Sequence, residues 1–153
     1  MTNALTIAEV SARCGLPQST IRYWERIGLL PRVQRDPSSG HRRYSLGLAE
    51  QLETLANLRS VGMSINDMRA YLDGQQRGDA AAGEQRALFQ THADRLTDQL
   101  ASLQLRHSYL ELKVQYWAAR EAGDLARADA VADRLRAVIA QLTPRTNPTE
   151  KDS

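Results

Sequence analysis

The chain has 153 residues, of which 42% are hydrophobic and 25% charged, the balance of an ordinary soluble folded protein. No apolar run approaches the roughly 18 residues of a membrane span, and the first ten residues do not have the pattern of a signal peptide. The single cysteine, Cys14, excludes an intramolecular disulfide and is typical of a reducing compartment. We therefore expect a cytoplasmic protein with no membrane partner.

The formal net charge of +2 is unevenly distributed along the chain. The first 45 residues contain seven arginines and three carboxylates, whereas the remainder is net negative. Arginine is the side chain best suited to bidentate contacts with phosphates and base edges. Such a cluster also fits a solvated basic surface, so on its own it leaves nucleic-acid binding open.

Two short helices joined by a tight turn are predicted first. Thr6 and Glu9 have capping-box spacing, and Gly15 is placed to end that helix. The second helix, QSTIRYWERI, ends at Gly28 and carries Trp24 on its packing side. Its other side offers hydroxyl, phenol and guanidinium donors, as a groove-reading helix needs: Ser19, Arg22, Tyr23 and Arg26. A surface helix with exposed arginines is the alternative, and the position after a tight turn favours DNA recognition.

The next segment predicts a small β-hairpin with a basic tip. Residues 36–40, DPSSG, have turn composition and lie between the stretches 32–35 and 41–44, both rich in arginine. So short a hairpin is stable only when it packs on the helices. A hairpin in this position is a wing, whose arginines are candidates for contacts with the DNA backbone or minor groove.

Two more helices are expected to form the packing floor of this region. Ser45 caps a third helix with leucines at helical spacing that ends at Gly62. Ser64 starts a fourth helix, whose apolar stripe includes Met68 and which we expect Gly74 to end. The polar and small residues of 75–83 then predict a hinge.

From residue 84 the apolar residues follow one another in alternating steps of four and three, with no proline or glycine from 84 to 122. Such a helix cannot bury its stripe against itself, so we expect it to pair with a second copy of the chain. A monomer that folds back the shorter helix of 124–142 is the alternative. Residues 143–153 are expected to form a disordered tail. The dimerisation seam comprises Phe89, Ala93, Leu96, Leu100, Leu103, His107, Leu110, Val114 and Trp117.

The order of these motifs resembles the MerR family of transcription regulators. The matching stretches are TIAEV at 6–10, TIRYWERIGLL at 20–30, GHRRYS at 40–45 and LRSVGMS at 58–64, about half of the chain. The resemblance implies a mainly α fold, with a winged helix-turn-helix domain over 1–74 and an antiparallel coiled-coil dimerisation helix over 84–122. It also implies double-stranded promoter DNA and RNA polymerase as partners. A homodimer would bend and undertwist an overlong promoter spacer.

The resemblance also supplies candidate DNA contacts. Arg22, Tyr23 and Arg26 match the recognition helix, and Arg42 and Tyr44 match the wing. His41 stands where a tyrosine is common in the family, and Trp24 stands where many members have tyrosine. The full predicted set is Ser19, Thr20, Arg22, Tyr23, Arg26, Arg35, His41, Arg42, Arg43 and Tyr44.

Neither a metal nor another cofactor is expected. Soft metals select thiolates, and the one cysteine lies in the first helix, where burial is the simpler explanation. A small organic effector held near the end of the long helix is one expectation, and simple helix packing by the same side chains is the other. These side chains are Tyr109, Tyr116, Trp117 and Arg120. A DNA-architectural or excisionase-like module without an effector remains the alternative function. An enzyme is not expected, since no nucleophile–base pair or phosphate-binding loop occurs.

Overall fold

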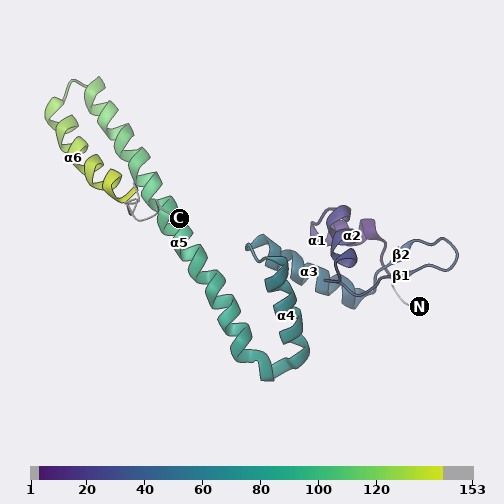
Figure 1. Ribbon diagram of the computed structural model, residues 1–153. Helices are drawn as coiled ribbons and strands as arrows, with labels where there is room; N and C mark the ends of the chain where they lie inside the picture. Colours follow the sequence, from purple (N-terminus) through teal and green to yellow (C-terminus); the bar gives the residue numbers. More distant parts are fainter. Residues whose placement is uncertain (1–3, 143–153) are drawn as a thin grey trace, which may run out of the picture. The chain divides into compact units, whose positions relative to one another are not determined.

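The computed structural model describes residues 4–142, and the chain divides within its longest helix into a first unit up to His92 and a second unit from Ala93 (Figure 1). The architecture is mainly α with one antiparallel two-stranded hairpin, as the sequence predicts. In chain order the elements are α1 (Ile7–Cys14), α2 (Gln18–Arg26), β1 (Gln34–Arg35), β2 (Arg42–Arg43), α3 (Leu46–Ser60), α4 (Ile65–Arg77), the 3₁₀ helix η1 (Gly78–Ala81), α5 (Ala82–Glu121) and α6 (Leu125–Leu142).

The helix-turn-helix of α1 and α2 begins with the predicted capping box. The backbone N–H of Glu9 donates to Thr6 Oγ1 at 3.3 Å, and the backbone N–H of Thr6 donates to Glu9 Oε2 at 2.7 Å. Hydrogen bonds to the Glu9 carboxylate from the backbone N–H and the hydroxyl of Thr6 lower the pKa of this carboxyl. Gly15 ends α1 in the left-handed conformation, with φ +67°. These local interactions fix where α1 begins and ends, and α2 starts directly after Pro17.

The wing is the hairpin β1–β2, in which Gln34 pairs with Arg43 and Arg35 with Arg42. The Asp36 carboxylate holds the turn, accepting hydrogen bonds from the backbone N–H groups of Ser38 and Ser39 at 2.8 and 3.0 Å. Hydrogen bonds from Ser38 and Ser39 hold the pKa of Asp36 well below its usual range. At the base of the hairpin, Leu5 and Tyr44 exchange two backbone hydrogen bonds, which attach the wing to the start of α1.

The core of the first unit is one cluster of apolar side chains contributed by all four helices and both arms of the wing. Trp24 and Tyr44 are its largest wholly buried members, and the inward position of Trp24 confirms its predicted role in packing. Arg69 of α4 also donates to the backbone carbonyl of Ile27, at 2.6 Å, and so attaches α4 to the end of α2. The buried cluster comprises Val10, Leu16, Ile21, Trp24, Leu29, Leu30, Val33, Tyr44, Ala49, Leu52, Leu55, Leu58, Met63 and Met68.

Ser45 and Ser64 cap α3 and α4 as predicted, but the prediction that Gly74 ends α4 is wrong. The helix continues to Arg77, and the whole of the expected hinge at 75–83 is helical or 3₁₀. The reason is a close approach by α5: the Gln85 side chain donates to the carbonyl of Tyr71 at 2.8 Å and crosses Gly74. A Cβ atom on Gly74 would lie 2.5 Å from Gln85 Nε2. The glycine therefore makes room for a neighbouring helix instead of ending its own.

The first turns of α5 belong to the first unit because they pack on α4. The rings of Tyr71 and Phe89 meet edge to face, with centroids 5.8 Å apart. His92 is 6% exposed, and its Nε2 hydrogen bonds with Asp67 Oδ2 at 2.9 Å. Leu88 packs on the edge of the core cluster. These contacts join the beginning of the long helix to the helix-turn-helix unit.

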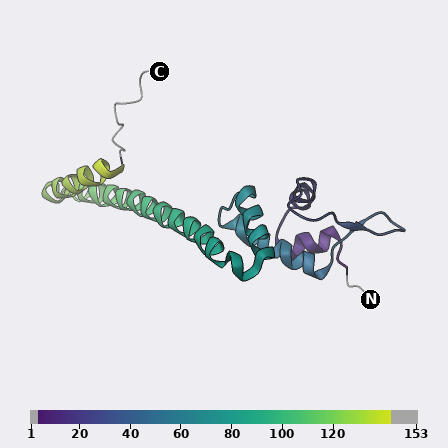
Figure 2. The ribbon, with the colours of Figure 1, turned by 60° about the horizontal axis from the view of Figure 1, so that its bottom comes forward.

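The second unit is an antiparallel pair formed by α5 and α6. Gly123, with φ +72°, allows the tight reversal between them, and the Asp124 carboxylate caps α6 by accepting from the backbone N–H of Arg127 at 3.0 Å. Figures 1 and 2 both show α6 beside the last part of α5. Leu112 packs there with Val131 and Leu135 of α6. The predicted tail, 143–153, lies outside the described residues, and none of the described helices is long and apolar enough to cross a membrane.

Candidate nucleic-acid interface

The outer side of α2 carries the polar groups that the sequence predicts. Ser19, Arg22, Tyr23 and Arg26 are exposed, whereas Thr20 is half-buried. The Arg26 guanidinium lies over the Tyr23 ring, 5.4 Å from its centroid, in a cation–π contact that orders both side chains. Arg22 Nη2 donates to Gln18 Oε1 at 3.3 Å. This side of α2 therefore presents donors to the surroundings while Ile21 and Trp24 face the core.

The wing contributes a second set of cations. Arg35 and His41 are exposed, and Arg42 and Arg43 are half-buried. Arg35 Nη1 donates to the carbonyl of Gly40 at 3.1 Å, across the hairpin. Arg43 Nη2 lies 3.5 Å from Asp36 Oδ2. Arg35 and Arg43 are thus each held to the hairpin, Arg35 by its backbone and Arg43 by its turn.

A groove forms where α1, α2 and the wing meet, and five of the ten predicted DNA-binding residues line it. Its arginines come from α2 and from both strands of the wing. The N-terminus of α1 also contributes, and helix N-termini favour anions. The sequence reasoning missed this third wall, although the capping box had marked the start of that helix. The lining residues are Thr6, Ile7, Ala8, Arg22, Arg35, Gly40, His41, Arg42 and Arg43.

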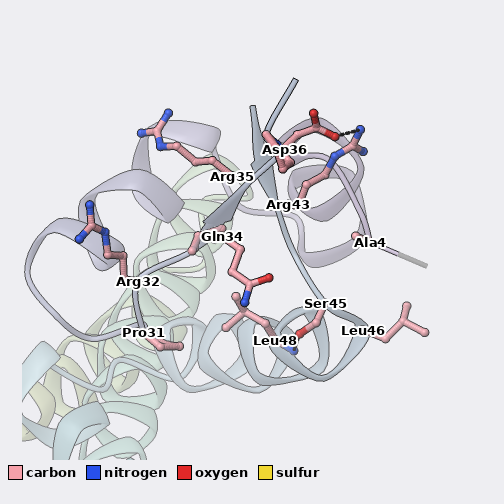
Figure 3. Close-up of a pocket in the computed structure, with 12 residues that line it drawn as sticks. Ala4, Pro31, Arg32, Gln34, Arg35, Asp36, Arg43, Ser45, Leu46 and Leu48 are labelled. Atoms are coloured by element: carbon pink, nitrogen blue, oxygen red, sulfur yellow. Dashed lines mark hydrogen bonds and ion pairs between the residues drawn. The ribbon is translucent and has the colours of Figure 1, made fainter. Parts of the chain in front are cut away.

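Figure 3 shows a second groove, on the other side of the wing, between β1 and the start of α3. Leu46 and Leu48 of α3 form an apolar wall. Arg32 and Arg35 extend their guanidinium groups outward from the wing side. Arg32 is exposed but was not among the predicted contacts. Positive charge is therefore present along both sides of β1.

The prediction that Tyr44 contacts DNA from the wing is wrong. Its side chain is wholly buried, so it has no surface to offer DNA. Its hydroxyl has no hydrogen-bond partner among the residues that the structure describes. Burial, together with the charge of Glu25, raises the pKa of its phenol. Tyr44 anchors the base of the wing in the core.

Arg42 is also engaged within the protein. Its Nε donates to Glu25 Oε2 at 2.8 Å, and the side chains of Arg42 and Glu25 are only 25% and 14% exposed. The second carboxylate oxygen, Glu25 Oε1, accepts from the backbone N–H of Val33 at 3.4 Å. Sequence reasoning did not single out Glu25. The ion pair joins residues 17 positions apart, a contact that no local pattern indicates.

The predicted seam along α5 is largely uncovered in the single chain. Its large apolar side chains after Phe89 are between 46% and 70% exposed. With 3.6 residues per turn, Leu103, Leu110 and Val114 lie roughly 160–180° around the helix axis from Leu112, the residue that α6 covers. The fold-back of α6, the alternative to pairing, therefore leaves the seam open. The exposed members are Leu96, Leu100, Leu103, Leu110, Val114 and Trp117.

Two members of the seam have neighbours within the single chain. Phe89 already contacts Tyr71 of its own chain and is 39% exposed. His107 is exposed in the single chain, like the leucines of the seam, and its Nε2 lies 3.9 Å from Glu111 Oε1. Neither finding removes the apolar stripe between these positions.

Two of the four side chains considered for an effector pack between helices, and the other two are exposed. Tyr109 and Tyr116 are half-buried against the cluster that joins α5 to α6. Arg120 Nη1 donates to Tyr116 Oη at 3.2 Å, and Trp117 meets Tyr116 edge to face at 5.3 Å. Cys14 is half-buried in α1, and burial raises the pKa of its thiol. Residues 4–142 contain no group of three or more His, Cys, Asp or Glu side chains that could hold a metal ion.

A helix-turn-helix joined to a two-stranded wing, with arginines gathered between them, defines the class of winged helix-turn-helix DNA-binding proteins. Two family models agree with this classification. The model of the MerR HTH family regulatory protein matches residues 5–75, and that of the MerR DNA-binding domain matches residues 49–112. The chain belongs to the MerR family of transcriptional regulators, whose members are regulators and not enzymes.

Relatives and solved structures agree with this assignment. An uncharacterised HTH-type transcriptional regulator of Haemophilus influenzae is 30% identical over 112 residues, covering 73% of this chain and 82% of the relative. HmrR of Rhizobium leguminosarum bv. viciae is 37% identical over 87 residues, 57% of this chain and 66% of that protein. The crystal structure of HiNmlR, a MerR family regulator lacking the sensor domain, bound to promoter DNA, matches with a TM-score of 0.64 at 29% identity, over 84% of this chain and 95% of that one. A putative MerR regulator from Listeria monocytogenes shares the fold, with a TM-score of 0.63 at 23% identity over 91% and 99% of the chains.

Proposed function

We propose that this protein regulates transcription as a homodimer whose two winged helix-turn-helix units bind one pseudo-palindromic promoter duplex. The observation that carries the proposal is the groove lined by Arg22 of α2 and by the arginines of the wing. Guanidinium groups on two elements can contact phosphates and base edges of the same duplex. The DNA-bound relative HiNmlR supports promoter DNA as the partner.

Within this proposal α2 reads bases and the wing contacts the backbone. A recognition helix enters the major groove, where each base pair presents a distinct pattern of donors and acceptors. Arg22, Tyr23 and Arg26 lie on the side of α2 that is free to enter it. Arg35, His41 and Arg43 are the proposed wing contacts. Tyr44 is not part of the proposed interface.

Pairing through α5 would bring a second winged helix-turn-helix unit, from another copy of the chain, into the complex. An apolar stripe that α6 leaves exposed needs a partner, because soluble proteins seldom leave so large an apolar surface in contact with water. A second copy offers the same heptad stripe. The family resemblance favours antiparallel pairing, which would place one DNA-binding unit at each end of the paired helices.

Promoter distortion completes the proposed mechanism. Two DNA-binding units, one from each chain and held by one pair of helices, fit a spacer only when its half-sites have a particular separation and a particular rotation about the DNA axis. Bending and undertwisting an overlong spacer would bring its polymerase contact elements into register, and the more extensive protein–DNA interface would offset the deformation energy. RNA polymerase is the partner that such a change would affect.

The proposed effector, if the protein uses one, is a small organic molecule and not a soft metal. One relative is named a mercuric resistance operon regulatory protein, from Bacillus cereus, and is 32% identical over 74 residues. Soft metals are bound by several thiolates, whereas this chain has the single Cys14. Regulation without any effector remains the alternative.

Selection of duplexes from a random-sequence pool tests the DNA-binding proposal. We expect the wild-type protein to enrich a two-fold symmetric sequence and to bind it more tightly than unselected duplex of equal length. An architectural or excisionase-like module would bind one half-site as a monomer, and sedimentation of the complex distinguishes this. Failure to enrich any sequence would contradict the proposal.

A further inference from the structure

Glu25 is an acid placed among the arginines of the proposed interface. It lies on α2 between Arg22 and Arg26, on the helix proposed to enter the DNA groove. A carboxylate near a polyanion weakens binding on Coulombic grounds. Its presence there calls for a role that offsets this repulsion.

The contacts of Glu25 reach both arms of the wing. Oε2 accepts from Arg42 Nε of β2 at 2.8 Å, and Oε1 accepts from the backbone N–H of Val33, just before β1, at 3.4 Å. Hydrogen bonds with a charged partner are stronger than neutral ones, above all when water has little access. Here the Glu25 side chain is 14% exposed and that of Arg42 25%. One carboxylate therefore connects the recognition helix to both arms of the hairpin.

Other contacts hold the wing at its turn and at its base. The Asp36 carboxylate organises the turn from within the hairpin. The bridge between Leu5 and Tyr44 attaches the wing to the segment before α1. Val33 and Tyr44 are buried beneath the hairpin and hold its base. The ion pair of Glu25 with Arg42 is a direct polar contact between α2 and the wing.

We propose that Glu25 is a positioning residue that locks the wing to the recognition helix, acting through Arg42 and Val33 and not by touching DNA. The inference rests on the proposed DNA-binding function and adds that the two sets of arginines act as one rigid reading surface. Arg42 then serves mainly as the wing's attachment point. The cations left to contact the duplex are Arg22 and Arg26 of α2 and Arg35 and Arg43 of the wing.

The decisive variant is Glu25→Gln in the full chain, with Glu53→Gln as its matched control. Glu53 of α3 also pairs with an arginine, since Arg13 Nε donates to its Oε1 at 2.6 Å, but this pair joins α1 to α3. Both substitutions remove one negative charge and one ion pair. Coulombic repulsion alone would make both variants bind DNA more tightly.

We expect Glu25→Gln to bind the duplex selected by the wild-type protein about tenfold more weakly, the effect of losing one charge-assisted hydrogen bond. Glu53→Gln should bind as tightly as wild type or more tightly. The loss should shrink when Arg35→Ala is also present, since a wing that has lost one of its DNA contacts gains less from being positioned. Equal or tighter binding by Glu25→Gln, or full additivity with Arg35→Ala, would overturn the inference.

Limited trypsin digestion of the DNA-free protein tests the lock separately from DNA binding. Trypsin cleaves after arginine, and the wing carries Arg35, Arg42 and Arg43. In Glu25→Gln we expect faster cleavage after Arg35, with the cooperative thermal melt retained, whereas Glu53→Gln should match wild type. If Glu25→Gln does not fold, Arg42→Gln breaks the same ion pair from the wing side. Unchanged cleavage in the folded variant refutes the lock even where DNA binds. Wild-type protein that selects no duplex refutes the proposed function, whatever the digestion shows.

Discussion

Leu103 lies near the middle of the exposed α5 stripe, and its replacement should dissociate the proposed dimer. Its side chain is 57% exposed in the single chain, and complete burial of a leucine is worth about 1.5–3 kcal/mol. Covering the exposed part thus contributes about 0.9–1.7 kcal/mol for each copy, or about 1.7–3.4 kcal/mol for a symmetric pair. Since every 1.4 kcal/mol is a factor of ten, Leu103→Ala should raise the dimer dissociation constant roughly 20- to 300-fold. Leu103→Asp should raise it further, because a carboxylate would be buried in the seam.

Sedimentation velocity over a range of protein concentrations measures this effect. We expect wild-type protein to sediment as a dimer at concentrations where Leu103→Asp is monomeric and still helical by circular dichroism. Ser102→Asp is the matched control, because it adds the same charge about 100° away around the helix, outside the stripe. If Leu103→Asp and Ser102→Asp retain the wild-type association constant, the seam is not the dimer interface.

Further substitutions test the interface and the fold. Arg22→Ala should weaken binding to the selected duplex. It should also make the slope of log binding constant against log salt concentration shallower by about 0.9, the contribution of one phosphate contact. Fluorescence titration at several salt concentrations measures the slope, and an unchanged slope excludes a phosphate contact. Gly74→Ala should gain about 1 kcal/mol of helix propensity but displace the Gln85 amide, so calorimetry should show a clear rise in melting temperature only when Gln85→Ala is also present. Because its pKa is lowered in the folded wing, the Asp36 carboxylate stabilises the turn at and above its ordinary pKa of about 4, and this contribution is lost as pH falls through the lowered value. Amide chemical shifts of the turn should therefore stay constant down to about pH 4 and change only below it; a transition centred near neutral pH would contradict this role.

The local signals in the sequence predict most of the elements of the fold. Capping groups such as Thr6, Ser45 and Ser64 act within one helical turn of themselves, so their effect is encoded by neighbouring residues. The alternating apolar steps after residue 84 similarly predict both the long helix and its uncovered stripe. Where a residue interacts only with its near neighbours, spacing is sufficient.

Contacts between distant segments account for what the sequence could not predict. A glycine that ends a helix and one that accommodates a neighbouring helix have the same letter, so Gly74 was assigned to the wrong role. Tyr44 lies between arginines and a serine, and nothing nearby indicates that it enters the core. The Glu25–Arg42 pair depends on how the wing folds back against α2, which no periodicity describes.

The mass of the protein–DNA complex in solution tests dimerisation and DNA binding together. Sedimentation equilibrium of wild-type protein with a selected two-fold symmetric duplex should give two chains per duplex, the mass expected when one dimer occupies both half-sites. A saturated complex of one chain per duplex, or a protein that sediments alone in the presence of that duplex, would contradict the mechanism.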